Sequence, residues 1–271
     1  MGNTKPFTQE SPTRFITFAN RKGGCGKTTT VINIAHAMAL AGHRVLIVDM
    51  DPQAHASLSL GFSPETDRMN VAHVLAKEIT MDKAVLNTHL GNIDLIPASR
   101  DLTQYEIHHS VKEGQETNLT DTITTARERY DVVIIDPPPT VSLLMISSLV
   151  AATEVYIPLQ MNFLAMEGLA EMMRLIYLVN ATWNPDLRLQ GIVPTFFNKN
   201  TRLSKGICRE IIHNFGKEKM APAVRTNIKL AEAPGYKQTI FEFDPKSIGA
   251  DDYRKLARFI LNSHESFENH G

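Results

Sequence analysis

The chain has 271 residues, of which 43% are hydrophobic and 21% are charged, and its formal net charge at pH 7 is −1. These proportions are ordinary for a globular protein, and the length is enough for a sizeable buried core. The two cysteines are too few for a disulfide framework, and no apolar run approaches the roughly 20 residues that span a bilayer.

Strand-like and helix-like segments alternate along the chain, as in a parallel sheet covered by helices on both faces. In chain order we expect a strand over residues 14–19, a helix over 27–41, a strand over 44–48, a short helix over 71–77, a strand over 93–97, a helix over 119–129, a strand over 132–135, a helix over 141–151, a strand over 154–159, a helix over 164–179, a strand over 189–197, and helices over 203–215 and 251–262. Pro194 predicts an irregularity in its strand. The predicted fold class is α/β, a single domain with a mostly parallel twisted sheet and helices on both faces.

The two ends of the chain are predicted to lie outside this domain. Residues 1–13 are polar and form a loose N-terminal segment without the apolar core of a signal peptide, residues 14–262 form the domain, and residues 263–271 form a polar tail. Met1-Gly2 resembles the start of a myristoylation signal, but Pro6 stands where serine or threonine is expected. We therefore expect a reduced, cytoplasmic protein.

A glycine-rich stretch follows the first predicted strand and opens the first predicted helix, which is the context of a phosphate-binding loop. Small residues allow backbone N–H groups to surround a polyphosphate, while Lys27 reaches its β and γ oxygens and Thr28 offers a hydroxyl to Mg²⁺. Cys25 occupies a variable position, where its small side chain is expected to pack. The expected nucleotide-binding residues of the loop are Lys22, Gly23, Gly24, Cys25, Gly26, Lys27, Thr28 and Thr29, the last at the α-phosphate.

The loop departs from the general pattern G-x-x-x-x-G-K-[ST], because Arg21 stands at the position of the first glycine. It carries instead a second lysine, Lys22, five residues before Lys27. A single subunit has little need of this second lysine. Its presence suggests a nucleotide shared between two subunits.

Carboxylates follow two of the predicted strands. Asp49 and Asp51 come after the strand 44–48, and Asp136 ends the apolar run 132–135. Ligands of open α/β sheets bind at the C-terminal edge of the strands. Alternation along an extended chain places Asp49 and Asp51 on the same side, where two acids repel one another unless a cation or water lies between them.

Four segments, in this order, resemble the ParA/MinD family of deviant Walker A ATPases. They are the loop described above, Asp49-Met50-Asp51-Pro52-Gln53, Ile134-Ile135-Asp136-Pro137-Pro138 and Leu230-Ala231-Glu232-Ala233-Pro234. The last two are more similar to the ParA/Soj branch, which partitions plasmids and chromosomes, than to MinD. The resemblance covers nearly the whole chain and implies a P-loop NTPase fold that binds ATP and Mg²⁺ and hydrolyses ATP.

The resemblance also implies roles for the acidic residues. Asp51 positions or deprotonates the attacking water, Asp49 supports the Mg²⁺ shell, and Asp136 resembles the Walker B aspartate that holds Mg²⁺ through a water. The expected catalytic residues are Lys22, Lys27 and Asp51, and the expected metal ligands are Thr28, Asp49 and Asp136.

Residues farther along the chain are implied in nucleotide sensing and in adenine binding. The prolines at 137–139 stiffen a segment that senses the γ-phosphate in this family, although the family more often has another residue at position 137. Asn198 follows a strand at a position that often contacts adenine, and Pro234 lies in a loop that closes over the base. Asparagine after a strand is also a common turn former, and both readings stay open for Asn198.

Positive charge is concentrated in residues 196–240, which contain nine basic and three acidic residues. The formal net charge of this segment is therefore +6, and that of the remainder of the chain is about −7. Charge separated in this way indicates a polyanion facing one surface. Three of the basic residues follow helical spacing on one predicted face, which is also common on solvated helices. Together with two that the ParA resemblance implies in sequence-independent DNA binding, the expected DNA-binding residues are Arg202, Lys205, Arg209, Arg225 and Lys229.

The leading prediction is a ParA-type partition ATPase. ATP would bridge two subunits, the homodimer would bind DNA non-specifically on the nucleoid, and a ParB-like partner would stimulate hydrolysis to move a plasmid, a chromosome or another cargo. A MinD-like membrane-positioning ATPase is the alternative, but it requires a terminal amphipathic helix that binds lipid, and we expect no membrane partner. A small-molecule ligase or reductase component on the same loop is a third class, for which no second nucleophile or cluster of cysteines is evident.

Overall fold

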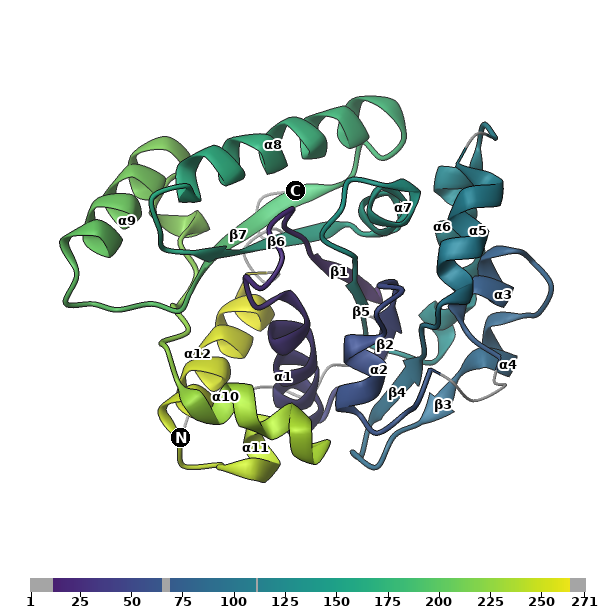
Figure 1. The fold of residues 1–271 in the computed structure, drawn as a ribbon, viewed down its shortest axis with the longest axis horizontal. Coiled ribbons are helices and arrows are strands. Elements are labelled where there is room, and N and C mark those ends of the chain that lie inside the picture. Colours follow the sequence, from purple (N-terminus) through teal and green to yellow (C-terminus); the bar gives the residue numbers. More distant parts are fainter. Residues whose placement is uncertain (1–11, 65–68, 111, 264–271) are drawn as a thin grey trace.

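The computed structural model describes residues 12–64, 69–110 and 112–263. Residues 1–11 of the predicted loose segment, and residues 264–271 of the predicted tail, lie outside this part of the chain. Within it, a sheet of seven strands has the order β3-β4-β2-β5-β1-β6-β7 (Figure 1). The strands are β1 (Arg14–Phe18), β2 (Val45–Asp49), β3 (Leu86–Asn87), β4 (Ile93–Ile96), β5 (Val132–Asp136), β6 (Glu154–Gln160) and β7 (Arg188–Thr195).

Every neighbouring pair of strands is parallel except β3 and β4, which are antiparallel. The helices are α1 (Lys27–Leu40), α2 (His55–Ser59), α3 (Val71–Leu75), α4 (Met81–Ala84), α5 (Asp101–His109), α6 (Asn118–Ile123), α7 (Leu143–Ala151), α8 (Ala165–Thr182), α9 (Arg202–Phe215), α10 (Ile228–Glu232), α11 (Ile240–Phe243) and α12 (Ile248–Asn262). The predicted α/β fold with a mostly parallel sheet is confirmed.

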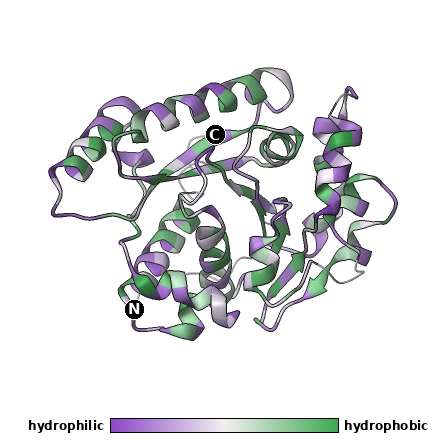
Figure 2. Ribbon diagram, in the orientation of Figure 1, coloured by the Kyte–Doolittle hydropathy of each residue, from purple (hydrophilic) through white to green (hydrophobic). Residues whose placement is uncertain are grey.

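Both faces of the sheet are covered, and the central strands β1, β2 and β5 are buried at every position. Along β5, Val133 and Ile135 join a core with α7 and α8, whereas Val132 and Ile134 join a second core with α1 and α12. In Figure 2 the covering helices alternate between hydrophobic and hydrophilic residues, as expected for helices with one buried side. The sheet therefore holds the ends of its central strands in fixed positions.

The strand that contains Pro194 is irregular, as predicted, but the irregularity does not lie at the proline. The register of β6 and β7 shifts instead between Val155 and Tyr156, where Leu189 and Gly191 are the successive partners. The carbonyl of Pro194 accepts from the N–H of Val224, on the side of β7 that faces away from β6. The proline nitrogen lies on that same side, so its missing N–H removes no bond to β6.

The segment predicted as one helix over residues 119–129 is divided. α6 ends at Ile123 and a 3₁₀ helix continues from Thr124 to Glu128. The Thr122 hydroxyl donates to the Asn118 carbonyl at 2.8 Å, and the Thr124 hydroxyl donates to the Thr120 carbonyl at 2.7 Å. Threonines that bond backward to the helix carbonyls weaken a regular α-helix, which accounts for the change.

Candidate functional site

Three adjacent strands end at the candidate site. The glycine-rich loop connects β1 to α1, and Asp49 and Asp136 are the last residues of β2 and β5, where they are direct partners in the parallel register. Because β5 lies between β2 and β1, the carboxylates and the loop lie at one edge of the sheet. The structure thus brings together the loop and the acids that were predicted separately.

The backbone of the loop requires glycine at two places. Gly24 and Gly26 have φ angles of +71° and +91°, in the left-handed region that a side chain disfavours. Gly26 directly precedes α1, and no side chain caps the N-terminus of this helix. Its first N–H groups are therefore available to an anion, as a phosphate-binding loop requires.

Cys25 is fully buried, and its carbonyl accepts from the Thr195 hydroxyl at 2.8 Å. Burial is the largest cause of the raised pKa of its thiol. A neutral, enclosed thiol agrees with the packing role expected from the sequence.

Thr28 and Asp136 form the centre of the site. The Thr28 hydroxyl donates to Asp136 Oδ2 at 2.7 Å, whereas Asp136 Oδ1 is buried and has no hydrogen-bond partner within the described residues. The pKa of Asp136 is raised well above its usual value, first by burial and then by the neighbouring charge of Asp49. A buried acceptor without a donor is costly. A hydrated cation beside Thr28 would satisfy it, so this pair fits a Mg²⁺ site.

Lys27 lies beside this pair. Its side chain is largely buried, and its Nζ donates to the Lys22 carbonyl at 3.3 Å. This contact holds the ammonium group on the inner side of the loop, where a phosphate would lie.

Asp49 is enclosed by protein donors. Its Oδ2 accepts from the Ser57 N–H at 2.9 Å and from the Ser57 hydroxyl at 2.7 Å, and its Oδ1 accepts from the Asp51 N–H at 3.2 Å. Burial raises its pKa to about 7 despite these bonds. Asp49 therefore orients Asp51 and the start of α2, and the predicted contact with the Mg²⁺ shell stays a prediction. Ser57 was not anticipated, because the short helix α2 has no clear signal in the sequence.

Asp51 lies at the rim of the site. Its side chain is about 8% exposed, and its Oδ1 accepts from the Gln53 N–H at 2.9 Å. The carboxylate is thus held by its own turn, next to the Asp49 and Asp136 pair. This placement suits a group that contacts a water near the phosphates.

Lys22 extends outward from the loop. Its side chain is exposed, and its Nζ donates to Gln160 Oε1 at 2.8 Å. Asn20 fixes the base of this turn, since its Oδ1 accepts from the Lys22 N–H at 3.0 Å and its Nδ2 donates to the Pro158 carbonyl at 2.6 Å. Sequence reasoning missed Asn20, which has no recognisable motif of its own. The ammonium of Lys22 is accessible to another molecule.

A small pocket lies beside the first turns of α1. The residues around it come from α1, from α2, from α10 and from the segment after α10, and they are Thr28, Thr29, Ile32, Asn33, Ser59, Leu230, Ala233, Pro234 and Gln238. Pro234 lines this pocket, and its predicted place over the base stays a prediction. Asn198 is exposed and does not line this pocket; its Oδ1 accepts from the Asn200 N–H at 3.0 Å, as in a turn.

The basic residues fall into two groups. Arg202, Lys205 and Arg209 are exposed on α9, whose opposite side buries Ile207 and Ile211. Among the described residues, none of the three basic side chains forms an ion pair.

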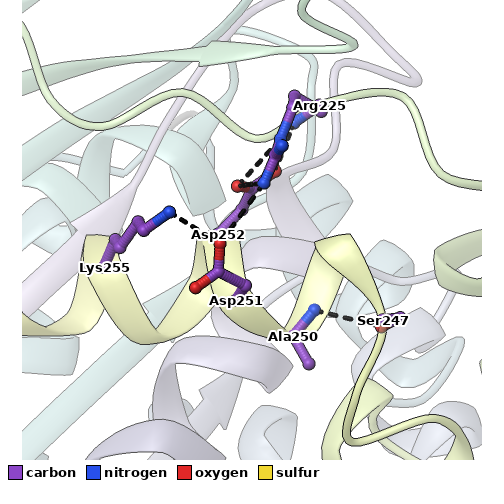
Figure 3. Close-up of polar contacts among 6 residues, drawn as sticks. All are labelled: Arg225, Ser247, Ala250, Asp251, Asp252 and Lys255. Atoms are coloured by element: carbon purple, nitrogen blue, oxygen red, sulfur yellow. Dashed lines mark hydrogen bonds and ion pairs between the residues drawn. The ribbon is translucent and has the colours of Figure 1, made fainter.

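The other two basic residues have carboxylate partners. Nζ of Lys229 lies 3.4 Å from Oε2 of Glu232. Arg225 forms ion pairs with Asp251 and Asp252 (Figure 3). The charge of Arg225 is therefore already balanced within the chain.

Known proteins of similar sequence and structure cover almost all of this chain. The family model described as AAA domain matches residues 13–189. Chromosome partitioning protein ParA of Caulobacter vibrioides is 35% identical over 254 residues, which are 93% of this chain and 95% of that protein. Sporulation initiation inhibitor protein Soj of Bacillus subtilis is 34% identical over 247 residues, 91% of this chain and 98% of that protein.

Among solved structures, cobyrinic acid a,c-diamide synthase from Mycobacterium smegmatis, with a bound ATP analog and magnesium, has a TM-score of 0.82 at 33% identity. The match covers 94% of this chain and 96% of that one. The phosphate loop, the paired strand-end carboxylates and this extent of identity to ParA and Soj lead to one assignment. The chain belongs to the ParA/Soj family of P-loop ATPases.

Proposed function

We propose that the chain binds ATP and Mg²⁺ at the edge formed by β1, β2 and β5, hydrolyses ATP there, and acts in DNA partition. The single observation that carries this proposal is the Thr28–Asp136 pair, whose second carboxylate oxygen is buried and has no protein donor in the described part of the chain. Thr28 and Asp136 would hold Mg²⁺, which when bound neutralises phosphate charge. Family membership agrees with this activity.

The proposed roles of the other side chains follow from where they lie. Lys27 compensates charge on the transferred phosphoryl group, and the uncapped N-terminus of α1 binds the phosphates. Asp51 orients the attacking water or accepts its proton. Pro234 borders the base, and the predicted role of Asn198 at adenine stays a prediction.

ATP would also control association with DNA. In this proposal Lys22 reaches the nucleotide of a second subunit, and the resulting dimer joins two copies of the exposed basic side of α9. Two weak patches that act together bind more strongly than either alone, so ATP favours DNA binding by favouring the dimer. A ParB-like partner would stimulate hydrolysis and release the DNA. Contacts to phosphates would make binding independent of DNA sequence.

Co-sedimentation of the protein with DNA or with anionic liposomes, each with and without ATP, tests the proposal. We expect ATP-dependent recovery with DNA alone. No helix of the described residues is long and apolar enough to cross a membrane. ATP-dependent recovery with liposomes in place of DNA would favour the MinD-like alternative and contradict the proposal.

Mg²⁺ is expected to raise the affinity of the parent for ATP, and Thr28→Ala should lose about tenfold of this gain. The reason is that the substitution removes the hydroxyl that donates to the Asp136 carboxylate at the metal site. Titration of a fluorescent ATP analogue with Mg²⁺ and with EDTA measures this gain. Thr28→Ser, which keeps the hydroxyl, is the matched control and should behave as the parent. A Thr28→Ala protein that keeps the full Mg²⁺ dependence would remove Thr28 from the metal site.

The α9 surface predicts a measurable salt dependence. If the six α9 cations of a dimer each neutralise one phosphate, log affinity should fall against log salt with a slope of about −5. The triple substitution Arg202→Glu, Lys205→Glu and Arg209→Glu should abolish DNA binding while ATP still binds. Its matched control reverses three exposed charges outside α9, Lys83→Glu, Arg100→Glu and Lys112→Glu. Equal loss of affinity in both triple variants would show that α9 is not the DNA surface.

A further inference from the structure

The segment of residues 226–239, here called the pocket segment, forms one side of the pocket next to α1. It contributes Leu230, Ala233, Pro234 and Gln238 to the lining. Its regular structure consists of α10 and a 3₁₀ helix of residues Ala233–Tyr236. Helices this short are not stable by themselves, so attachments at the two ends must determine where the segment lies.

At the start of the pocket segment, Arg225 is bound to Asp252 of α12 (Figure 3). The Asp252 carboxylate is 4% exposed, and its Oδ2 accepts from the Arg225 N–H and from Nε, both at 2.9 Å. Nη2 of the guanidinium donates to Asp252 Oδ1 and also lies 3.4 Å from Asp251 Oδ2. Backbone and side chain of Arg225 are therefore both fixed to α12.

This pairing leaves Arg225 poorly suited to a DNA phosphate. Its guanidinium presents the forked side, Nε and Nη2, to a buried carboxylate. A phosphate that took this forked side would have to displace Asp252, and a buried carboxylate without its partner is strongly destabilising. The geometry thus assigns the forked side of Arg225 to Asp252 within the chain, although the arginine side chain is 38% exposed.

At the end of the pocket segment, Asn33 of α1 makes the second attachment. Its Oδ1 accepts from the Ile240 N–H at 2.8 Å, and its Nδ2 donates to the Thr29 carbonyl at 2.7 Å. One buried amide therefore connects the first turn of α1 with the residue that follows the pocket segment. The neighbouring His36 reinforces it, with Nδ1 lying 2.6 Å from the Thr239 hydroxyl.

We propose that Asn33 and the Arg225–Asp252 pair are positioning residues that hold both ends of the pocket segment against the nucleotide. The inference rests on the proposed ATP site, because the pocket adjoins Thr28 and Thr29. Neither attachment touches Asp51 or Asp136, so the attachments affect nucleotide affinity and leave the chemical step unchanged. Loosening either end moves the wall that carries Pro234 away from α1.

The first experiment compares Asn33→Ala with Asn184→Ala. Asn184 is an equally structural asparagine whose Nδ2 donates to the carbonyls of Leu149, Val150 and Ala152, away from the pocket. Asn33→Ala should raise both the Kd of a fluorescent ATP analogue and the KM for ATP about tenfold, with kcat retained at saturating ATP. Asn184→Ala should lower the thermal unfolding midpoint while leaving the Kd unchanged.

Asn33→Asp serves as a second variant of nearly the same size. It keeps an acceptor for the Ile240 N–H but turns an oxygen toward the Thr29 carbonyl, so its Kd should also rise. A Kd within twofold of the parent for both Asn33 variants would overturn the role of Asn33. A parent protein that does not bind Mg²⁺ and ATP would overturn the proposed function itself, and this inference with it.

The second experiment concerns the other end. Arg225→Lys keeps the charge but lacks the planar fork, and Asp252→Asn keeps the shape but lacks the charge. Both should raise the Kd for ATP about tenfold and leave DNA affinity at saturating ATP unchanged. Loss of DNA affinity together with unchanged ATP affinity would make Arg225 a phosphate contact and overturn its positioning role.

Discussion

Asp51→Ala is expected to lower ATP turnover by a factor of about 10²–10⁴ while the protein still binds ATP, because groups that orient or deprotonate the attacking water typically contribute this much. The Asp51 side chain is held at the rim of the site by the Gln53 N–H, at a distance of 2.9 Å. Its loss therefore removes a positioned carboxylate without disturbing the Thr28–Asp136 pair. Phosphate release at saturating ATP measures the turnover, and titration of an ATP analogue measures the binding.

Asp51→Asn distinguishes the two forms of this role. The amide oxygen can still accept from the Gln53 N–H and orient a water, but the group cannot accept a proton at neutral pH. Turnover close to that of Asp51→Ala would indicate a general base, whereas intermediate turnover would indicate orientation of the water. Parental turnover in Asp51→Ala would remove Asp51 from the mechanism.

Lys22→Ala is expected to abolish the ATP-dependent dimer while the monomer keeps its fold and some of its nucleotide affinity. Within the described chain the Lys22 ammonium group donates to Gln160 on the exposed surface and not to any carboxylate. This position is consistent with a contact to phosphate from a second subunit, where one cation would compensate buried negative charge. Light scattering with a non-hydrolysable ATP analogue measures the dimer.

Arg21→Ala is the matched control for this experiment. It removes the same unit of charge from the adjacent residue, where Arg21 pairs with Glu171 at 2.9 Å with both side chains partly exposed. Exposed ion pairs of this kind contribute little to the free energy of folding, so the Arg21→Ala variant should fold and dimerise as the parent does. If Lys22→Ala also dimerises normally, the nucleotide is not shared through Lys22.

The parts of the site that could be predicted from the sequence are those encoded within a few adjacent residues. The phosphate loop could be predicted because it is one short motif between a strand and a helix that are contiguous with it. Asp49 and Asp136 were predicted at the ends of their own strands, and the parallel pairing of β2 with β5 shows that they are direct partners. The short edge strand β3 and the helix α5 were missed because their apolar patterns are weak and their positions depend on tertiary packing.

The contacts that could not be predicted are those between residues distant in sequence. Arg225 was grouped with the DNA-binding residues because of the ParA resemblance and the basic segment around it, but its partner Asp252 comes 27 residues later, on α12. Asp49 was expected near the metal shell, but Ser57 folds back to occupy one of its oxygens. In both cases the sequence shows the charged residue, but only the structure shows the group that binds it, which is Asp252 for Arg225 and Ser57 for Asp49.

Residues that form hydrogen bonds in and beside the site are far apart in the sequence, which affects when the site can form while the protein is being synthesised. Thr28 meets Asp136 across 108 residues, and Asn33 meets Ile240 across 207. A nascent chain therefore carries the complete glycine-rich loop long before it carries the rest of the pocket. At translation rates of about 5–20 residues per second, the delay between the two is on the order of ten seconds or more. On the proposed site, ATP would gain its full set of contacts, and so its full stabilising effect, only in a nearly finished chain.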